Sequence, residues 1–171
     1  MQQKIIKKQN NSSSCFICGL NNSFGFKARF YELENKQLVS IVTGDSNHQS
    51  YPNRMHGGLI SALLDETIGR AIQIYHSDLF GVTTSLSIKY RKPVPLNKKL
   101  IVIGTITSDT RLLFEGEGAI YDTDFNLLAT ATGKYMKIDF NKISEKELDE
   151  HSDWFFEEDL NPLQYIEIPE A

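Results

Sequence analysis

The sequence has little cysteine, no long apolar run and no recognisable targeting signal. Its 171 residues include only two cysteines, and in a chain without a secretion signal this favours reduced thiols and a cytoplasmic location. No apolar run is long enough to cross a bilayer, and no apolar segment follows the basic residues near the N-terminus. Neither a membrane span nor a signal peptide is therefore expected. The chain length and the absence of an internal repeat predict one domain that acts away from membranes.

The two cysteines form a Cys15-x-x-Cys18 motif, which could indicate zinc binding or redox chemistry. A structural zinc site normally has four ligands, and no second cysteine pair or closely spaced histidine pair supplies the missing ones. A redox dithiol is expected between a strand and a helix, as in thioredoxin, whereas this motif precedes a turn-rich stretch. We interpret the cysteines as small buried residues that brace a loop, and we expect no metal and no cofactor.

The net charge of −4 is unevenly distributed along the chain. Residues 144–171 contain ten acidic residues and one lysine, whereas the rest of the chain contains 17 basic and 12 acidic residues. A mildly basic body suits an anionic ligand, and the acidic tail forms a separate module. No helix-turn-helix pattern precedes the main domain, which argues against a DNA-binding regulator and a nucleic-acid partner.

The most informative stretch covers residues 56–71, with the sequence HGGLISALLDETIGRA. Its apolar residues recur at the spacing of a buried helix, which is expected to continue to about Tyr75. Asp65 lies within this apolar register, where a carboxylate is costly unless it is paired or used. Gly57 and Gly58 leave free N–H groups at the start of the helix, where negative charge is favoured. An acid inside a helix and an anion-stabilising helix start together suggest acyl transfer.

Six segments have the alternation or the β-branched composition of strands. They cover residues 27–33, 37–43, 81–90, 100–107, 111–121 and 127–138. The last four are joined by short turns, so they predict an antiparallel sheet that curls around the helix preceding them. The fold class is therefore α+β. Residues 1–14 are polar and are expected to form a flexible leader, while Ser144-Glu145-Lys146-Glu147 is a capping box that predicts a short acidic helix.

This order of strands, a His56-Gly57-Gly58 helix and four long strands resembles the hot-dog-fold thioesterases. In particular it is similar to the acyl-CoA thioesterase branch that includes the phenylacetate-degradation thioesterase PaaI. The specific part is the His-Gly-Gly motif with an acid nine residues after the histidine, here Asp65. The resemblance implies a hot-dog domain over residues 15–140, between the leader 1–14 and an acidic C-terminal extension, 141–171. It also implies a homodimer or homotetramer whose protomers join their sheets edge to edge, with the active sites at the dimer interface.

The same resemblance implies roles for individual residues. Asp65 would be the general base or the nucleophile in the hydrolysis of an acyl-CoA thioester. The backbone N–H of Gly57, with Gly58 beside it, would stabilise the oxyanion. His56 would line the site and orient the thioester carbonyl.

Further positions are candidates for binding the substrate or the attacking water. The resemblance places a water-positioning hydroxyl early in the strand after the helix, at Thr83, with Thr84 next to it. Related enzymes often carry asparagine six residues before the histidine, where this sequence has Ser50, so Gln49 is a candidate for the amide role. Asn53, in the same loop, is a candidate because asparagine tolerates the left-handed conformation, and Glu66 is a candidate because it lies beside Asp65. Arg91 and Lys92 are candidates for binding the CoA phosphates.

Two alternatives stay open beside the thioesterase. A hot-dog dehydratase would use a histidine, His48 or His56, together with Asp65. A non-catalytic hot-dog module would bind acyl-CoA without hydrolysing it, but such a module can dispense with the acid. The sequence does not specify the identity of the acyl chain or whether the protein is a dimer or a tetramer. It also does not specify whether Asp65 acts as a base or as a nucleophile.

Overall fold

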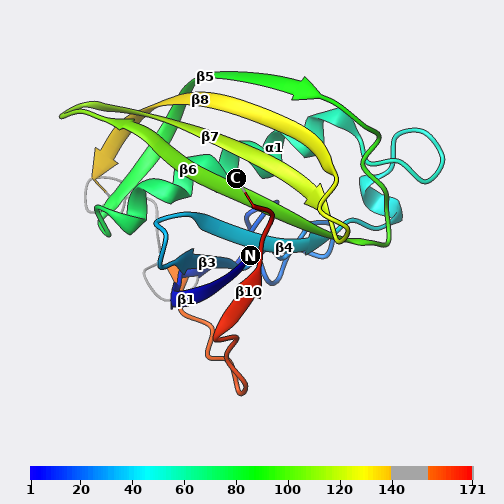
Figure 1. Cartoon of the computed structure of the whole chain (residues 1–171), viewed down its shortest axis with the longest axis horizontal. Coiled ribbons are helices and arrows are strands. Elements are labelled where there is room, and N and C mark those ends of the chain that lie inside the picture. Colours follow the sequence, from blue (N-terminus) through cyan, green and yellow to red (C-terminus); the bar gives the residue numbers. More distant parts are fainter. Residues whose placement is uncertain (140–153, 171) are drawn as a thin grey trace.

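A curled antiparallel sheet of eight strands wraps around one long helix in the computed structural model (Figure 1). The structure describes residues 1–139 and 154–170. The strand order is β10-β1-β3-β4-β6-β7-β8-β5, and the α+β hot-dog architecture expected from the sequence is confirmed. The strands of this sheet are β1 (Gln2–Lys8), β3 (Phe30–Leu33), β4 (Leu38–Thr43), β5 (Leu79–Tyr90), β6 (Lys99–Asp109), β7 (Leu113–Asp122), β8 (Leu127–Asp139) and β10 (Tyr165–Glu167).

The central helix α1 (Gly57–Arg70) is continued by the 3₁₀ turn η2 (Ala71–Ile74), so the helical segment ends where the spacing predicts. It follows a loop that contains a second 3₁₀ turn, η1 (Ser46–His48). The apolar positions of the predicted register are all buried against the inner face of the sheet: Ile60, Leu63, Leu64, Ile68 and Ile72. The helix is therefore fixed by hydrophobic packing on most of its circumference.

The six predicted strands correspond to β3 to β8. The largest difference in a boundary is at the start of β3, which begins at Phe30 rather than at residue 27. Lys27 has a φ angle of 52°, a left-handed conformation that interrupts an extended strand. The long strand β5 forms one edge of the sheet and pairs with β8, the last of the four, rather than with β6, which follows it in sequence.

The expectation of a flexible leader over residues 1–14 is wrong. In Figure 1, β1 lies between β10 and β3, and it pairs with both of them. A second, short sheet joins β2 (Asn11–Ser12) to β9 (Trp154–Phe155). The physical reason is a second apolar cluster on the outer face of the sheet. Ile166 and Ile168 from the C-terminal segment, with Ile5 of β1, pack there against side chains of β3, β4 and β6: Tyr31, Leu33, Val39, Ile101 and Ile103.

The described part of the C-terminal segment is bound to the body by ion pairs. Glu157 contacts both Lys8, at 2.8 Å, and Arg29, at 2.5 Å. The Arg29 guanidinium, with help from Lys8, lowers the pKa of Glu157 to about 2, so this carboxylate stays charged far below neutral pH. The predicted helix at Ser144 lies outside the described residues. Over residues 1–139 and 154–170, no helix is both long and apolar enough to span a membrane.

Gly104 on β6 sets how closely the helix can approach the sheet. A Cβ atom there would lie 2.7 Å from the backbone oxygen of Thr67 and 3.0 Å from its carbonyl carbon. Because helix backbone cannot rotate aside as a side chain can, we expect Gly104→Ala to lower the stability by about 1–3 kcal/mol. Each kcal/mol corresponds to about 2–4 °C in Tm for a chain of this length.

The measurement is thermal unfolding at one fixed protein concentration. The matched control is Thr105→Ala on the same strand, since Thr105 lines the outer face of the sheet and does not contact the helix. We expect the control to unfold within about 1 °C of the wild type, as most surface changes do. Equal Tm values for Gly104→Ala and the wild type would show that the helix can move away from β6 at little cost.

Candidate active site

The carboxylate of Asp65 projects from the middle of α1 towards strands β5 and β8. Its Oδ1 accepts a hydrogen bond of 2.8 Å from the Thr83 hydroxyl and one of 3.2 Å from the Tyr135 hydroxyl. Asp65 is half-buried and Thr83 is exposed, so the group lies at the open edge of the core rather than deep inside it. No described residue donates a hydrogen bond to Oδ2. The carboxylate is therefore held in place through Oδ1, while Oδ2 remains available to contact a ligand.

Tyr135 on β8 is a positioning residue that the sequence did not reveal. Its ring is 1% exposed and stacks on Phe114 at a centroid distance of 4.9 Å. The same hydroxyl also donates to the backbone oxygen of Asp65, at 3.3 Å. Burial, together with the negative charge of Asp65, raises the pKa of Tyr135. The phenol thus stays protonated and acts as a donor that fixes the carboxylate.

The two glycines at the start of α1 differ in whether their N–H group is already hydrogen-bonded. His56 is the N-cap, and its Nδ1 accepts a hydrogen bond of 3.0 Å from the Gly58 N–H. Nδ1 as acceptor leaves the proton on Nε2, so His56 can donate towards a ligand. Among the described residues, no acceptor is found for the Gly57 N–H. Gly57, not Gly58, therefore supplies the unoccupied donor at the positive end of the helix.

Two hydroxyl groups hold the first turn of the helix in place. The carbonyl oxygen of Gly57 accepts hydrogen bonds from Tyr90, at 3.1 Å, and from Ser61, at 3.0 Å. The Tyr90 and Ser61 oxygens are themselves 2.8 Å apart. Strand β5 therefore contacts α1 at both functional points, through Thr83 at the acid and through Tyr90 at the helix start.

The side chains of two further candidates, Glu66 and Thr84, do not contact the Asp65 carboxylate. Glu66 points to another side of the helix, where it forms an ion pair of 2.7 Å with Arg70. Thr84 donates to the backbone oxygen of Lys134. Of the two threonines, only Thr83 contacts the catalytic candidate.

The loop before the helix is ordered by its own side chains. Gln49 accepts a hydrogen bond of 3.0 Å from the Asn53 N–H, and Asn53 has the left-handed φ angle of 63° that its residue type favours. The ring of His48 is 1% exposed, stacks on Phe26, and bonds to the Phe24 oxygen and the Asp45 N–H. Because both ring nitrogens of His48 are used inside the loop, this histidine cannot serve Asp65 in a dehydratase.

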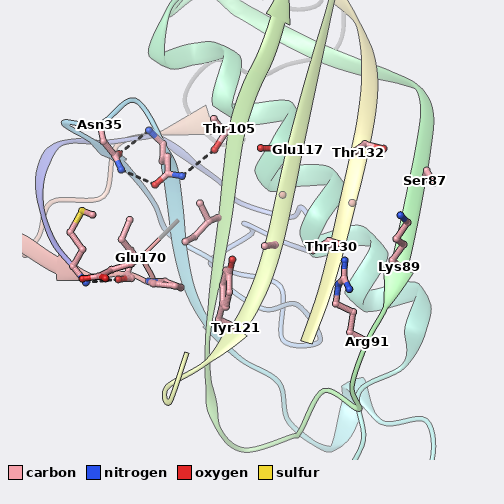
Figure 2. A pocket seen from close by; sticks show the side chains of 18 residues that line it. Asn35, Ser87, Lys89, Arg91, Thr105, Glu117, Tyr121, Thr130, Thr132 and Glu170 are labelled. Atoms are coloured by element: carbon pink, nitrogen blue, oxygen red, sulfur yellow. Dashed lines mark hydrogen bonds between the residues drawn. The ribbon is translucent and has the colours of Figure 1, made fainter. Parts of the chain in front are cut away.

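The basic candidates lie elsewhere. Arg91 lines a hollow of about 620 Å³ on the outer face of the sheet, on the opposite side from α1. Figure 2 shows Ser87, Lys89 and Arg91 along β5 at one side of this hollow, with Tyr121 and Glu117 further across the sheet. Lys92 contacts Asn126, at 3.4 Å. The structure does not bring Arg91 or Lys92 together with Asp65, and their contact with CoA stays a prediction.

Comparison with known proteins shows which family the chain is similar to. The model of the thioesterase superfamily matches residues 53–129, which include the helix, strands β5 to β7 and the first three residues of β8. Acyl-coenzyme A thioesterase THEM4 of Rattus norvegicus is 31% identical over 139 residues, which cover 80% of this chain and 59% of that protein. The chain therefore spans about three-fifths of the length of this curated relative.

Solved structures agree on the fold. The PaaI protein of E. coli, from the phenylacetic acid degradation operon, superimposes with a TM-score of 0.60 at 16% identity, covering 66% of this chain and 80% of that one. A hypothetical thioesterase of Streptococcus pneumoniae, solved with coenzyme A, gives a TM-score of 0.56 at 22% identity, covering 60% and 82%. The chain is thus similar to the thioesterase superfamily over residues 53–129, and it has the hot-dog fold.

The hydrogen bond from Thr83 to Asp65 should matter for any reaction in which this carboxylate takes part. Thr83→Val removes the donor and keeps the shape, so we expect the rate of such a reaction to fall about tenfold, the effect of roughly 1.4 kcal/mol in the transition state. Thr83→Ser should restore most of the rate, because serine keeps the hydroxyl.

The matched control is Thr84→Val, whose hydroxyl bonds only to a backbone oxygen on β8 among the described residues. Its kcat should stay within about twofold of the wild type, because the change leaves Asp65 untouched. If both valine variants lost the same activity, the effect would belong to the strand and not to the carboxylate.

Proposed function

We propose that the protein is an acyl-CoA thioesterase, which hydrolyses a thioester to a free acid and CoA. The observation that carries this proposal is the carboxylate of Asp65, anchored through Oδ1 by Thr83 and Tyr135 while Oδ2 is left for chemistry. The name of the rat relative and the coenzyme A in the S. pneumoniae structure support the substrate class. Both cysteines are free, which supports the predicted cytoplasmic location.

The chemistry follows from the two groups on α1. As a general base, Asp65 takes a proton from water while the water oxygen attacks the thioester carbonyl carbon. The Gly57 N–H donates to the oxyanion that forms, an interaction worth about 3–4 kcal/mol in comparable sites. The C–S bond then breaks, and the CoA sulfur leaves and takes up a proton. Direct attack by Asp65 would use the same oxygen and the same oxyanion donor.

Within one protomer, these two groups are too far apart for this reaction. Gly57 and Asp65 are eight residues apart on one helix, which separates them by roughly 12 Å along its axis. One thioester carbonyl cannot contact both. The proposed site therefore needs Gly57 from a second copy of the chain.

The free edge of β5 is the surface that can supply this second copy. In the described chain β5 pairs only with β8, and its other edge exposes an unpaired backbone over a long strand, which proteins normally cover. Antiparallel pairing of two β5 edges, centred between Leu86 and Ser87, places Thr83 opposite Tyr90 of the second copy. Since Thr83 holds Asp65 and Tyr90 holds Gly57, this register forms two shared sites.

The experiment is a panel of acyl-CoA thioesters of different chain length and of aromatic type, assayed by thiol release. Turnover of at least one member, saturable and linear in enzyme, is the expected result. The non-catalytic acyl-CoA-binding module predicts the opposite, namely binding of the same compounds by calorimetry with no thiol release.

A further inference from the structure

The two cysteine side chains lie together beside the catalytic helix. The Sγ atoms of Cys15 and Cys18 and a carboxylate oxygen of Glu66 all lie within 4.8 Å of one another. The turn that joins the cysteines is closed by a hydrogen bond of 2.8 Å from the Gly19 N–H to the Cys15 oxygen. A Cβ atom at Gly19 would lie 2.3 Å from that oxygen, so the turn can close this tightly only with glycine there. The loop-bracing interpretation accounts for the turn, but not for what surrounds the sulfur atoms.

The environment of Cys15 favours its thiolate. Cys15 is half-buried, and its sulfur accepts hydrogen bonds from the backbone N–H groups of Ile17, at 3.3 Å, and Cys18, at 3.5 Å. Donation from the Cys18 thiol, with help from these backbone groups, lowers the pKa of Cys15 to about 6, against the effects of burial and of Glu66. A thiolate that solvent can reach is the nucleophilic form of cysteine.

Cys18 has the environment of a second, resolving thiol. It is 1% exposed, and its hydrogen bond to Cys15, together with burial, raises its pKa. Arg70 donates to its sulfur at 3.1 Å, and this guanidinium is itself only 4% exposed. Phe30 and Trp154 lie against the same guanidinium, at 4.6 and 4.5 Å from their ring centres. A buried cation is thus held where a negative charge on Cys18 would develop.

The same cation argues against a metal ion at this position. Cys15, Cys18 and Glu66 offer three ligand atoms, one fewer than a structural zinc site normally has. Two of these groups, Cys18 and Glu66, already accept hydrogen bonds from the Arg70 guanidinium. A divalent cation would have to displace or repel the guanidinium.

We propose that Cys15 and Cys18 form a peroxide-reactive dithiol that closes to an intramolecular disulfide beside α1. The Cys15 thiolate attacks one oxygen of hydrogen peroxide, the O–O bond breaks, and Cys15 becomes a sulfenic acid as hydroxide leaves. The sulfur of Cys18 then attacks the sulfur of Cys15. The S–O bond breaks, and the leaving oxygen departs as water with the Cys18 proton. Two thiols lose two electrons, and the peroxide is reduced to water.

The reactivity of Cys15 can be measured on the whole reduced protein with iodoacetamide. At pH 7 the lowered pKa raises the thiolate fraction well above that of an ordinary thiol, partly offset by weaker intrinsic nucleophilicity. We expect alkylation of Cys15 to be about two- to fourfold faster in the native protein than in the urea-unfolded chain, since most of the gain in thiolate is offset by the lower nucleophilicity. Cys18 should be protected in the native protein.

The products of peroxide treatment distinguish the two thiols. Wild-type protein should lose two hydrogens by intact mass and regain them with dithiothreitol. Cys18→Ser should stop at the sulfenic acid, which a 1,3-dione reagent traps, while Cys15→Ser should give neither product at a comparable rate. Two free thiols in the wild type after peroxide, or no trapped adduct in Cys18→Ser, would overturn the proposal. So would binding of one zinc ion that protects both thiols from alkylation. None of these readouts depends on thioesterase activity.

Discussion

Replacing Asp65 with asparagine is expected to lower the rate of acyl-CoA hydrolysis by about a hundredfold or more, the usual scale for losing a general base. Asparagine has nearly the same shape, and its amide oxygen can still accept the hydrogen bonds that Thr83 and Tyr135 donate to Oδ1. What the amide cannot do is take a proton from water or attack the carbonyl. The measurement is kcat for the best member of the substrate panel, with circular dichroism and Tm to confirm folding.

The matched control is Glu66→Gln, the acid directly beside Asp65 in sequence. Glu66 pairs with Arg70 on another side of the helix, so its neutralisation should change stability more than chemistry. We expect kcat within a few-fold of the wild type. An unchanged rate in Asp65→Asn would remove Asp65 from the mechanism, and equal losses in the two variants would attribute the effect to the helix as a whole.

The parts of the fold that the sequence predicted are those governed by local periodicity. In the helix from Gly57 and in the strands β3 to β8, the apolar residues are spaced as in a helix or in a strand, respectively. The residues that this spacing places on the inner face pack in the core. Asp65 could be singled out as a candidate for a related reason. A carboxylate in an apolar register has few structural explanations, and the His-Gly-Gly motif fixes its distance from the helix start.

What the sequence could not predict depends on contacts between distant residues. The strand β1 is polar and alternates weakly, and it is ordered because its partners, β3 and β10, come from remote parts of the chain. Tyr135 occupies an ordinary strand position in the sequence. Only the packing of β8 against the helix shows that its hydroxyl reaches Asp65. Likewise, the motif contains two glycines, and only the bond from Gly58 to His56 shows which N–H is left for a ligand.

The free donor at Gly57 allows a second test, in which a single N–H is removed from the protein. Proline is favoured at the first position of a helix, where its missing N–H and fixed φ angle fit, and Gly57 occupies that position. The preceding residue, His56, has φ −65° and ψ 136°, a conformation that proline permits in the residue before it. We expect Gly57→Pro to fold and to lose about 10²–10³ in kcat, as removal of an oxyanion-hole donor does elsewhere.

The matched control keeps the N–H and adds only a methyl group. In Gly57→Ala the new Cβ would lie 3.6 Å from the Tyr90 hydroxyl, an ordinary contact distance, so the rate should stay within about tenfold of the wild type. A loss in the alanine variant as large as in the proline variant would indicate that the space at Gly57 is needed, and not its hydrogen bond.

Mixing two inactive variants tests whether each site is shared between protomers. A dimer of one Asp65→Asn chain and one Gly57→Pro chain has one site with both defects and one site with neither, provided that Asp65 works with Gly57 of the other copy. After unfolding and refolding together in equal amounts, random pairing should restore about a quarter of the wild-type activity. If both groups acted within one protomer, no site would be intact and the mixture would stay inactive.

A clean monomer by light scattering would equally contradict the shared site. Asp65 and Gly57 of one copy are separated by roughly 12 Å along the helix, so a single copy has no oxyanion donor beside its acid.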